Sequence, residues 1–275
     1  MFGGDRLRVN VASTQIFARH AGWRQILVYA MQLSSADEVA MILPLPVAPG
    51  TREDAVRFID LSAYPRLFAD LDACFPQPPR PASRPQAASS ANSSRLRVQQ
   101  VGAFEASFVP TLADFTRLDP RFRLDDAIWR QLPGYADWGF AVVRLGPGRQ
   151  DVHPLALSFP KRFAERLFFP TVHVHDATLR PTAEFNHTLY FQRVAQPRLS
   201  GAASEAATFV AASEPVGTRV ELARCQGVLD GAEALARVQL SGSRPNEDVW
   251  LTDAAPAAAP DRTPGVRALL RRRGG

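Results

Sequence analysis

The chain has 275 residues, 46% of them hydrophobic, so it can bury a sizeable core without metal or disulfide staples. Its formal net charge is +5. The segments 76–95 and 253–275 each carry a net +3, which leaves the rest of the chain at −1. A nearly neutral body has no basic stripe for a phosphate backbone, so nucleic-acid binding is disfavoured except through the Arg-rich segment 253–275.

The cysteines and the hydropathy pattern indicate a reduced, soluble protein. Cys74 and Cys225 are too few and too far apart to form a disulfide framework. The sequence has no run of about 18 apolar residues that could span a bilayer, and residues 1–15 lack the apolar region of an export signal. We therefore expect a cytoplasmic protein without membrane contact. Lys161 is the one lysine among 32 basic residues, a bias typical of a GC-rich bacterial genome.

Two segments have the composition of disordered chain. Residues 76–95 are rich in Pro, Ala and Ser and contain no aliphatic residue larger than alanine, so burial cannot offset their ordering entropy. Residues 253–275 form a similar Arg-rich tail. We expect residues 1–75 and 96–252 to share one β-rich core, interrupted by the first disordered segment and followed by the second.

Most of the remaining sequence shows the apolar patterns that are typical of β-strands. In chain order we predict strands at 24–33, 38–47 and 55–62, a helix at 64–75, one bent or two short strands at 95–111, short helices near 111–118 and 125–132, strands at 138–146, 151–159, 166–175 and 183–194, a helix around 202–212, and strands near 217–224, 235–241 and 248–252. Because the strands come in runs with short connections, the predicted fold class is α+β, a mostly antiparallel β-sheet body with a few short helices.

The first two predicted strands, 24–33 and 38–47, are apolar on both alternating faces and are joined by the turn 34–37. This pattern is typical of central strands that are covered on both sides. Pro44 and Pro46 donate no ladder hydrogen bond, which predicts that the second strand ends at a sheet edge or leaves the sheet there.

Two stretches carry a resemblance to known proteins. EVAMILPLPV (38–47) and LFFPTVHVHD (167–176) resemble sequences of an uncharacterised bacterial protein family of unknown function. The resemblance implies no activity, fold or site, so every functional expectation comes from the residues themselves.

His173 and His175 stand one residue apart in the predicted strand 166–175. Side chains alternate across a strand, so both imidazoles point to one face and can reach one metal ion above the sheet. Many zinc sites combine such a pair with a third ligand from a neighbouring element.

The third ligand depends on how this strand pairs with the next one. In an antiparallel hairpin, one register places His187 opposite His173, and the alternative register places Glu184 opposite His175. Either arrangement offers a third ligand without requiring one, so a metal site with Zn²⁺ as the candidate ion is one hypothesis for this cluster.

Two more residues are candidates for the same site. His153, on the preceding predicted strand, can join from the side when the register allows it. Asp176 could be a ligand, an acceptor that orients an imidazole, or a turn residue, and we favour the turn role.

Paired histidines also occur on half-exposed sheets without any metal, with neighbours such as Tyr190 and Gln192 as hydrogen-bond partners. The leading hypothesis is therefore a soluble structural or interaction module with a protein partner and no inferable activity. The alternative is a zinc-type hydrolase or another metalloenzyme that uses the histidine cluster, with Glu184 or Asp176 as general base. A minor alternative is a modifier, because the end RRRGG resembles the processed end of ubiquitin-like modifiers. Whether the chain is an enzyme stays open at this point.

Overall fold

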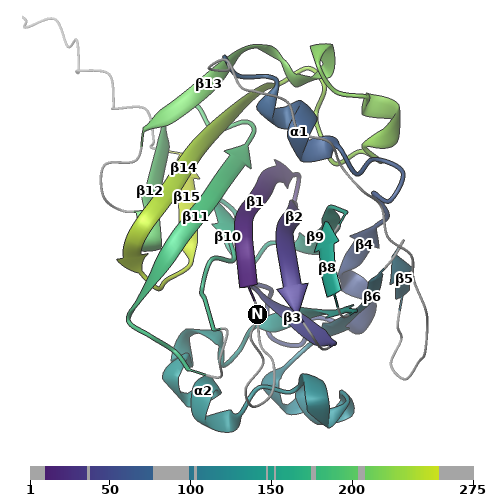
Figure 1. The fold of residues 1–275 in the computed structure, drawn as a ribbon, viewed down its shortest axis with the longest axis vertical. Helices are drawn as coiled ribbons and strands as arrows, with labels where there is room; N and C mark the ends of the chain where they lie inside the picture. Colours follow the sequence, from purple (N-terminus) through teal and green to yellow (C-terminus); the bar gives the residue numbers. More distant parts are fainter. Residues whose placement is uncertain are drawn as a thin grey trace, which may run out of the picture.

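A computed structural model describes residues 10–35, 38–76, 99–101, 104–146, 148–151, 153–174, 178–203 and 208–253. Within these residues the strands form three sheets (Figure 1). The largest has eight strands, in the order β13 (Phe209–Pro215), β14 (Ala234–Pro245), β11 (Thr182–Phe191), β1 (Asn10–Ala21), β2 (Arg24–Ser35), β9 (Leu155–Pro160) and β4 (Arg57–Ile59), with β8 (Gly148–Asp151) paired to β2. The four-stranded sheet has the order β3 (Val39–Leu45), β7 (Gly139–Leu145), β6 (Phe104–Val109) and β5 (Gln99–Val101). The three-stranded sheet has the order β10 (Arg166–Phe169), β15 (Val249–Asp253) and β12 (Pro197–Ser200).

Short helices complete the described part of the chain. The α-helices are α1 (Leu67–Asp72) and α2 (Asp126–Gln131). The 3-10 helices are η1 (Glu53–Ala55), η2 (Leu112–Arg117), η3 (Pro120–Phe122), η4 (Pro133–Tyr135), η5 (Gly201–Ala203), η6 (Val216–Thr218) and η7 (Leu222–Arg224). α2 begins where the Asp125 carboxylate accepts a hydrogen bond from the Ala127 N–H (2.6 Å), an ordinary N-cap.

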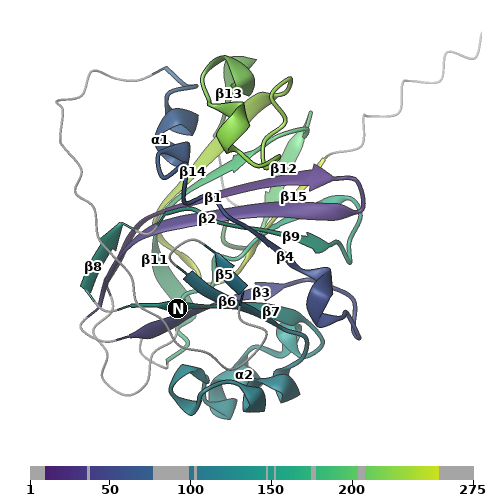
Figure 2. The ribbon, with the colours of Figure 1, turned by 90° about the vertical axis from the view of Figure 1, so that its right-hand side faces the viewer.

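The elements are stacked in layers, and hydrophobic clusters fill the spaces between them (Figure 2). One face of the eight-stranded sheet is covered by α1 and by the segment that contains η6 and η7. Its other face packs against the four-stranded and three-stranded sheets. α2 and the neighbouring 3-10 helices cover the far side of the four-stranded sheet with an aromatic cluster.

Side chains along a strand point alternately to its two faces, so one strand can pack against two layers. In β2, Leu27 and Met31 face the four-stranded sheet, whereas Ile26 and Val28 face α1. In β3 all seven residues are buried, because odd-numbered and even-numbered side chains enter different clusters. The apolar character of both faces, visible in the sequence, therefore reflects a position between two packed layers.

The prediction of a strand-rich chain with mostly antiparallel pairing and a few short helices is confirmed. One pair departs from it, since β1 and β11 run parallel, with Ile16 paired to Leu189. β3 is the edge strand of its sheet, as Pro44 and Pro46 predicted for the end of this run, so the central position predicted for 38–47 is wrong, whereas β2 is central as predicted.

Some local predictions are wrong. The strands predicted at 24–33 and 38–47 exist as β2 and β3, but they belong to different sheets. The helix predicted around 202–212 is replaced by η5 and β13, and the strand predicted near 217–224 by η6 and η7. The central strand β1 carries no clear alternating pattern and no prediction covered it.

Two predicted segments fall largely outside the described residues. Of 76–95 the structure describes Pro76, and of 253–275 it describes Asp253. The shared core of residues 1–75 and 96–252 stays a prediction, which expression of 96–252 alone would test.

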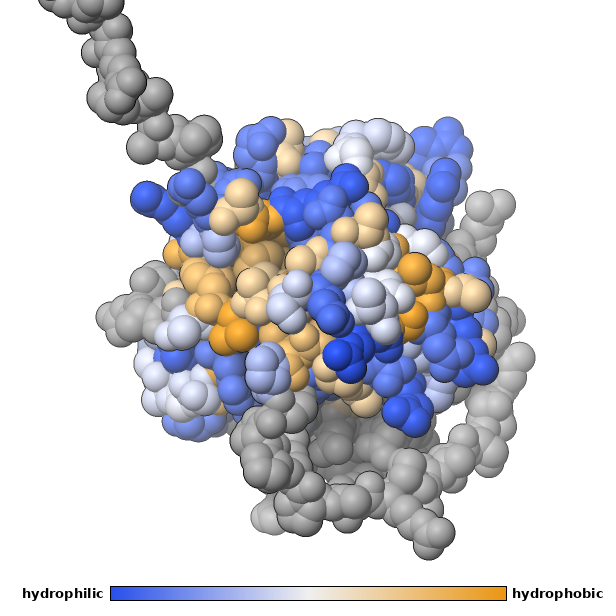
Figure 3. Space-filling model, turned by 90° about the horizontal axis from the view of Figure 1, so that it is seen from above, coloured by the Kyte–Doolittle hydropathy of each residue, from blue (hydrophilic) through white to orange (hydrophobic). Residues whose placement is uncertain are grey.

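The end of the molecule that carries α1 and β13 is mainly polar (Figure 3). In Figure 3, which looks onto this end, hydrophilic residues surround a smaller apolar area. The most exposed large apolar side chain is Trp23, 68% exposed in the turn between β1 and β2. None of the helices in the described ranges has both the length and the apolar character needed to cross a membrane.

Candidate functional site

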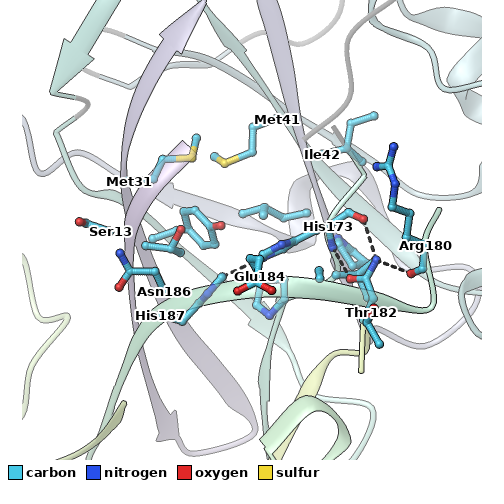
Figure 4. A pocket seen from close by; sticks show the side chains of 18 of the residues that line it. Ser13, Met31, Met41, Ile42, His173, Arg180, Thr182, Glu184, Asn186 and His187 are labelled. Atoms are coloured by element: carbon cyan, nitrogen blue, oxygen red, sulfur yellow. Dashed lines mark hydrogen bonds between the residues drawn. The ribbon is translucent and has the colours of Figure 1, made fainter. Parts of the chain in front are cut away.

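A cavity of ≈470 Å³ lies between the eight-stranded sheet and β3, beside the segment that follows β10 (Figure 4). One part of its wall is apolar and includes Met31 of β2 and Met41 of β3, whose thioether ends approach each other in Figure 4. The opposite part is polar and includes His173, His187 and Asn186. The cavity therefore offers both a hydrophobic and a hydrogen-bonding surface.

His187 is fixed by strand pairing on both sides. At this position β11 pairs with β1 through Thr14 and with β14 through Leu240. His187 lies on the same face of β11 as Phe185 and Leu189, whose side chains are part of the core between the sheets. Its side chain is only 3% exposed, so the imidazole stands in the core-facing surface of the sheet at the cavity wall.

His173 lies outside regular structure, because β10 ends at Phe169. A single side chain holds its backbone: the Asn246 amide donates from Nδ2 to the His173 carbonyl (2.8 Å) and accepts at Oδ1 from the His173 N–H (2.7 Å). The same Nδ2 also donates to the Arg180 carbonyl (3.0 Å). Asn246 thus takes the place of a strand partner and fixes the position of His173.

The two imidazoles meet at the cavity wall. Their Nε2 atoms are 3.3 Å apart, their ring centroids are 5.0 Å apart, and their ring planes differ by 24°. Phe185 supports the pair, with ring centroids 4.9 Å from His173 and 5.0 Å from His187. Burial lowers the pKa of His173 to about 4, so its ring is neutral at pH 7.

A buried carboxylate supports the segment that carries His173. Asp248 accepts hydrogen bonds from the backbone N–H groups of Thr171 (2.8 Å) and Val172 (3.2 Å) and from the Tyr135 hydroxyl. Thr171 also donates its hydroxyl to the carbonyl of Glu247 (2.8 Å). Burial raises the pKa of Asp248 to about 6 despite these donors.

An irregularity in β1 shapes another part of the wall. The pairing of β1 with β2 shifts between Ala12 and Gln15, and Ser13 in this bulge has a φ of 52°. Ser13 and Thr14 both line the cavity, and Thr14 is hydrogen-bonded to the side chain of Tyr29. Burial raises the pKa of Tyr29 to about 12, so its hydroxyl stays protonated at neutral pH.

The structure brings together two of the predicted metal ligands, His173 and His187, but not through the predicted hairpin. β10 ends at Phe169 and pairs with β15, whereas β11 pairs with β1 and β14, so His187 comes from a strand of the large sheet and His173 from the irregular segment that follows β10. Glu184 lines the same cavity. Among the described residues, no group of three or more His, Cys, Asp and Glu side chains is arranged to hold a metal ion.

The other predicted residues lie elsewhere. His153 packs against Phe104, with ring centroids 4.1 Å apart and ring planes tilted by 40°, and is not among the described residues that line the cavity. His175 and Asp176 fall outside the described residues. A metal-binding role for this set stays a prediction.

Sequence reasoning missed the residues that build the site around the histidines. Asn246 and Asp248 stand in a short polar stretch between β14 and β15, which reads as an ordinary turn. Met31 and Met41 read as core residues, which they also are. No local signal marks any of these four, because their roles depend on contacts between segments far apart in the chain.

Comparisons with known proteins give a fold likeness at low identity. No protein-family model matches the chain, and no curated protein matches it significantly. Among solved structures, the crystal structure of baculovirus P35 is 12% identical and is matched over 90% of this chain and 98% of that chain, with a TM-score of 0.44. A mutated baculovirus P35 after caspase cleavage is 13% identical (88% and 99% covered, TM-score 0.47), and so is the caspase-8/P35 complex (88% and 96% covered, TM-score 0.45). These TM-scores are below 0.5, so neither the fold nor the function of this chain rests on them.

Proposed function

We propose that the protein is an interaction module that binds a small amphipathic ligand in the cavity between its sheets. The observation that carries the proposal is the cavity itself. Its volume of ≈470 Å³ falls within the range of about 300–1,000 Å³ that is typical of small-molecule sites. Such sites combine apolar walls with a small number of placed polar groups, as this one does.

The two parts of the wall suggest the chemistry of the ligand. Met31, Met41 and Leu43 offer an apolar surface, and methionine side chains adapt their shape to the group they contact. His173 and His187 offer ring nitrogens at the polar part of the wall. A ligand with a flat apolar body and one hydrogen-bonding head group matches this arrangement.

The two cysteines do not supply a reactive thiolate to the cavity, which supports a binding role over thiol chemistry. Burial raises the pKa of Cys74, and it raises that of Cys225 to about 11, which disfavours the reactive thiolate in both. Neither residue lines the cavity. The described wall therefore supplies contacts and shape, and no cysteine nucleophile.

Anilinonaphthalene sulfonate is a suitable probe, because it combines flat apolar rings with an anionic head and becomes fluorescent in apolar sites. We expect the folded protein to bind it saturably at one site. Ala183 lines the cavity from β11, so Ala183→Phe should fill part of the cavity and weaken binding by roughly tenfold or more.

The matched control is Ala211→Phe, which adds the same ring at an exposed position of β13 away from the cavity. It should leave the affinity unchanged. Equal affinity of both variants, or absence of saturable binding to the wild type, would contradict the proposal.

A further inference from the structure

We infer that His173 and His187 form a two-nitrogen site for a divalent transition-metal ion at the polar wall of the cavity. The inference shares the cavity with the proposed function but depends on it only for access, since the ion needs no organic ligand. It also differs from the metal site expected from the sequence, because His173 comes from an irregular segment and not from a hairpin partner of β11, and no third protein ligand is required.

The distance between the two nitrogens fits a shared ion. Two ligands at about 2.0–2.1 Å from a tetrahedral ion are separated by about 3.3–3.4 Å. The Nε2 atoms of His173 and His187 are 3.3 Å apart. The spacing therefore allows both rings to coordinate one ion with little movement.

A direct hydrogen bond explains the same pair less well. An N–H···N bond of 3.3 Å would be longer than the usual 2.7–3.2 Å range of N–H···O bonds, and an in-line arrangement would place the ring centroids about 5.6 Å apart. The centroids of His173 and His187 are 5.0 Å apart, so the rings are bent away from the in-line geometry. Two imidazoles that coordinate one ion are likewise turned away from the in-line geometry.

Both ligands are fixed before any ion arrives. His187 is held by two neighbouring strands, and His173 by one hydrogen bond donated to Asn246 and one accepted from it. Phe185 contacts both rings from one side. Fixed ligands lose little conformational entropy on binding, which favours a site even with only two protein ligands.

The position of the cavity agrees with metal binding. Since both histidines line the cavity, the remaining coordination positions open toward it. Water, or a donor atom of a bound ligand, can occupy them.

Imidazole nitrogen selects the kind of ion. Cu²⁺, Ni²⁺ and Zn²⁺ accept imidazole readily, and Cu²⁺ binds most tightly in this series, whereas Mg²⁺ and Ca²⁺ prefer oxygen ligands. We therefore expect affinity to fall from Cu²⁺ to Zn²⁺ and to be absent for Mg²⁺.

The test is a titration of metal-free protein with ZnCl₂, followed by the NMR resonances of the histidine rings and by the melting temperature. Zn²⁺ should shift the resonances of His173 and His187 and raise the melting temperature by several degrees, because the ion binds the folded state. MgCl₂ should do neither. His173→Gln and His187→Gln should each weaken Zn²⁺ affinity by roughly tenfold or more.

The matched control is His153→Gln, which changes a half-buried histidine outside the cavity lining and should leave Zn²⁺ affinity unchanged. Melting of each variant without metal shows whether it folds, and the wild-type resonances test the site even if one variant does not. Unchanged affinity in folded His173→Gln or His187→Gln, or unshifted resonances of the pair at saturating Zn²⁺, would overturn the inference.

The two proposals fail in different ways. Binding of anilinonaphthalene sulfonate without any response to Zn²⁺ would sink the metal site alone. A response to Zn²⁺ at His173 and His187 without binding of the organic probe would support the metal site and sink the proposed function alone.

Discussion

The two faces of the eight-stranded sheet both bury polar side chains, but they treat them differently. On the face toward α1, the Asp72 carboxylate accepts from the Tyr190 hydroxyl (2.6 Å), from Arg237 (2.9 Å) and from Gln15 (3.3 Å). On the face toward the cavity, two imidazoles adjoin each other and open space. The first arrangement pairs a charge with an opposite charge and with hydroxyl and amide donors, while the second leaves room for another group.

This difference separates polar residues that hold the fold together from those that are able to bind. The half-buried Asp72 carboxylate accepts from several donors, so removing it leaves these donors without their acceptor and is costly. A neutral ring at a cavity wall contributes less to stability, and a ligand can use its ring nitrogen. The predictions below test this separation, beginning with the largest expected effect.

The cavity side depends on a close backbone approach behind the histidines. Gly201 has a φ of 76°, and a Cβ atom placed there would lie 1.8 Å from the carbonyl oxygen of Asp248. Gly201→Ala should therefore lower the free energy of unfolding by about 3 kcal/mol or more, measured by urea denaturation. Gly227→Ala is the control, because Gly227 has a similar φ of 74° but open space around it, and should cost about 1–2 kcal/mol. Equal losses would mean that the close approach to Asp248 is unimportant.

The pH dependence of stability should come from the cavity side and contain two opposing contributions. Asp248 has a folded pKa of about 6, above its ordinary value of 3.8, so its contribution is present below pH 4 and is lost as the pH rises to 6. His173 has a folded pKa of about 4, below its ordinary 6.5, so its contribution is present above pH 6.5 and is lost as the pH falls to 4. His20, whose pKa burial also lowers to about 4, acts in the same direction as His173.

Asp248→Asn should expose this compensation. The amide keeps an acceptor for the Thr171 and Val172 N–H groups but does not titrate. Denaturation at pH 4, 5, 6 and 7 should show that the variant gains more stability with pH than the wild type, because in the wild type the loss at Asp248 offsets part of the gain at His173 and His20. The Asp248 contribution is on the order of 3 kcal/mol across this window. Parallel pH profiles for variant and wild type would rule out a titrating Asp248.

The two faces should respond differently to loss of a polar side chain. Asp72→Ala leaves the Arg237 guanidinium without this carboxylate and should cost about 2 kcal/mol, a value moderated because the Asp72 side chain is 38% exposed. His187→Leu replaces a buried imidazole by an aliphatic chain of similar size and should change stability by less than about 1 kcal/mol at pH 7. A larger cost for His187→Leu than for Asp72→Ala would reverse the comparison.

The smallest effect is expected at the bulge in β1. Ser13 has a φ of 52°, which glycine adopts without steric cost, so Ser13→Gly should stabilise the protein by up to about 1 kcal/mol. Ala12→Gly in the same bulge is a control that gains no such relief. If both variants lose stability equally, the backbone of Ser13 is not strained.

Local patterns in the sequence predicted what single segments do. The apolar run with Pro44 and Pro46 predicted a buried strand at a sheet edge, and the period of Leu67, Phe68 and Leu71 predicted α1. The pairing partners of each strand could not be predicted, because pairing depends on segments that lie far apart in the sequence. Alanine-rich residues 202–212 favour a helix locally, yet Phe209 pairs with Val238 and extends the large sheet.

The candidate site shows the same limit. Sequence reasoning predicted that His173 and His187 could meet, but it assumed a hairpin between their strands. The structure brings them together through Asn246, which follows β14 and clamps a segment with no regular partner. A side-chain amide that takes the place of a strand partner has no local sequence pattern. The contact between His173 and His187 could therefore be predicted, but the role of Asn246 in forming it could not.

The parallel pair of β1 and β11 has a consequence for the order of events on the ribosome. β1 can form its hairpin with β2 soon after both emerge, but β11, its neighbour on the other side, ends at Phe191. At about 5–20 residues per second, roughly 10–30 s pass between the synthesis of this hairpin and the synthesis of β11. Throughout this interval one edge of the nascent hairpin, with Ile16 and Phe17 on its two faces, has no permanent neighbour, which makes it a natural point of contact for a chaperone.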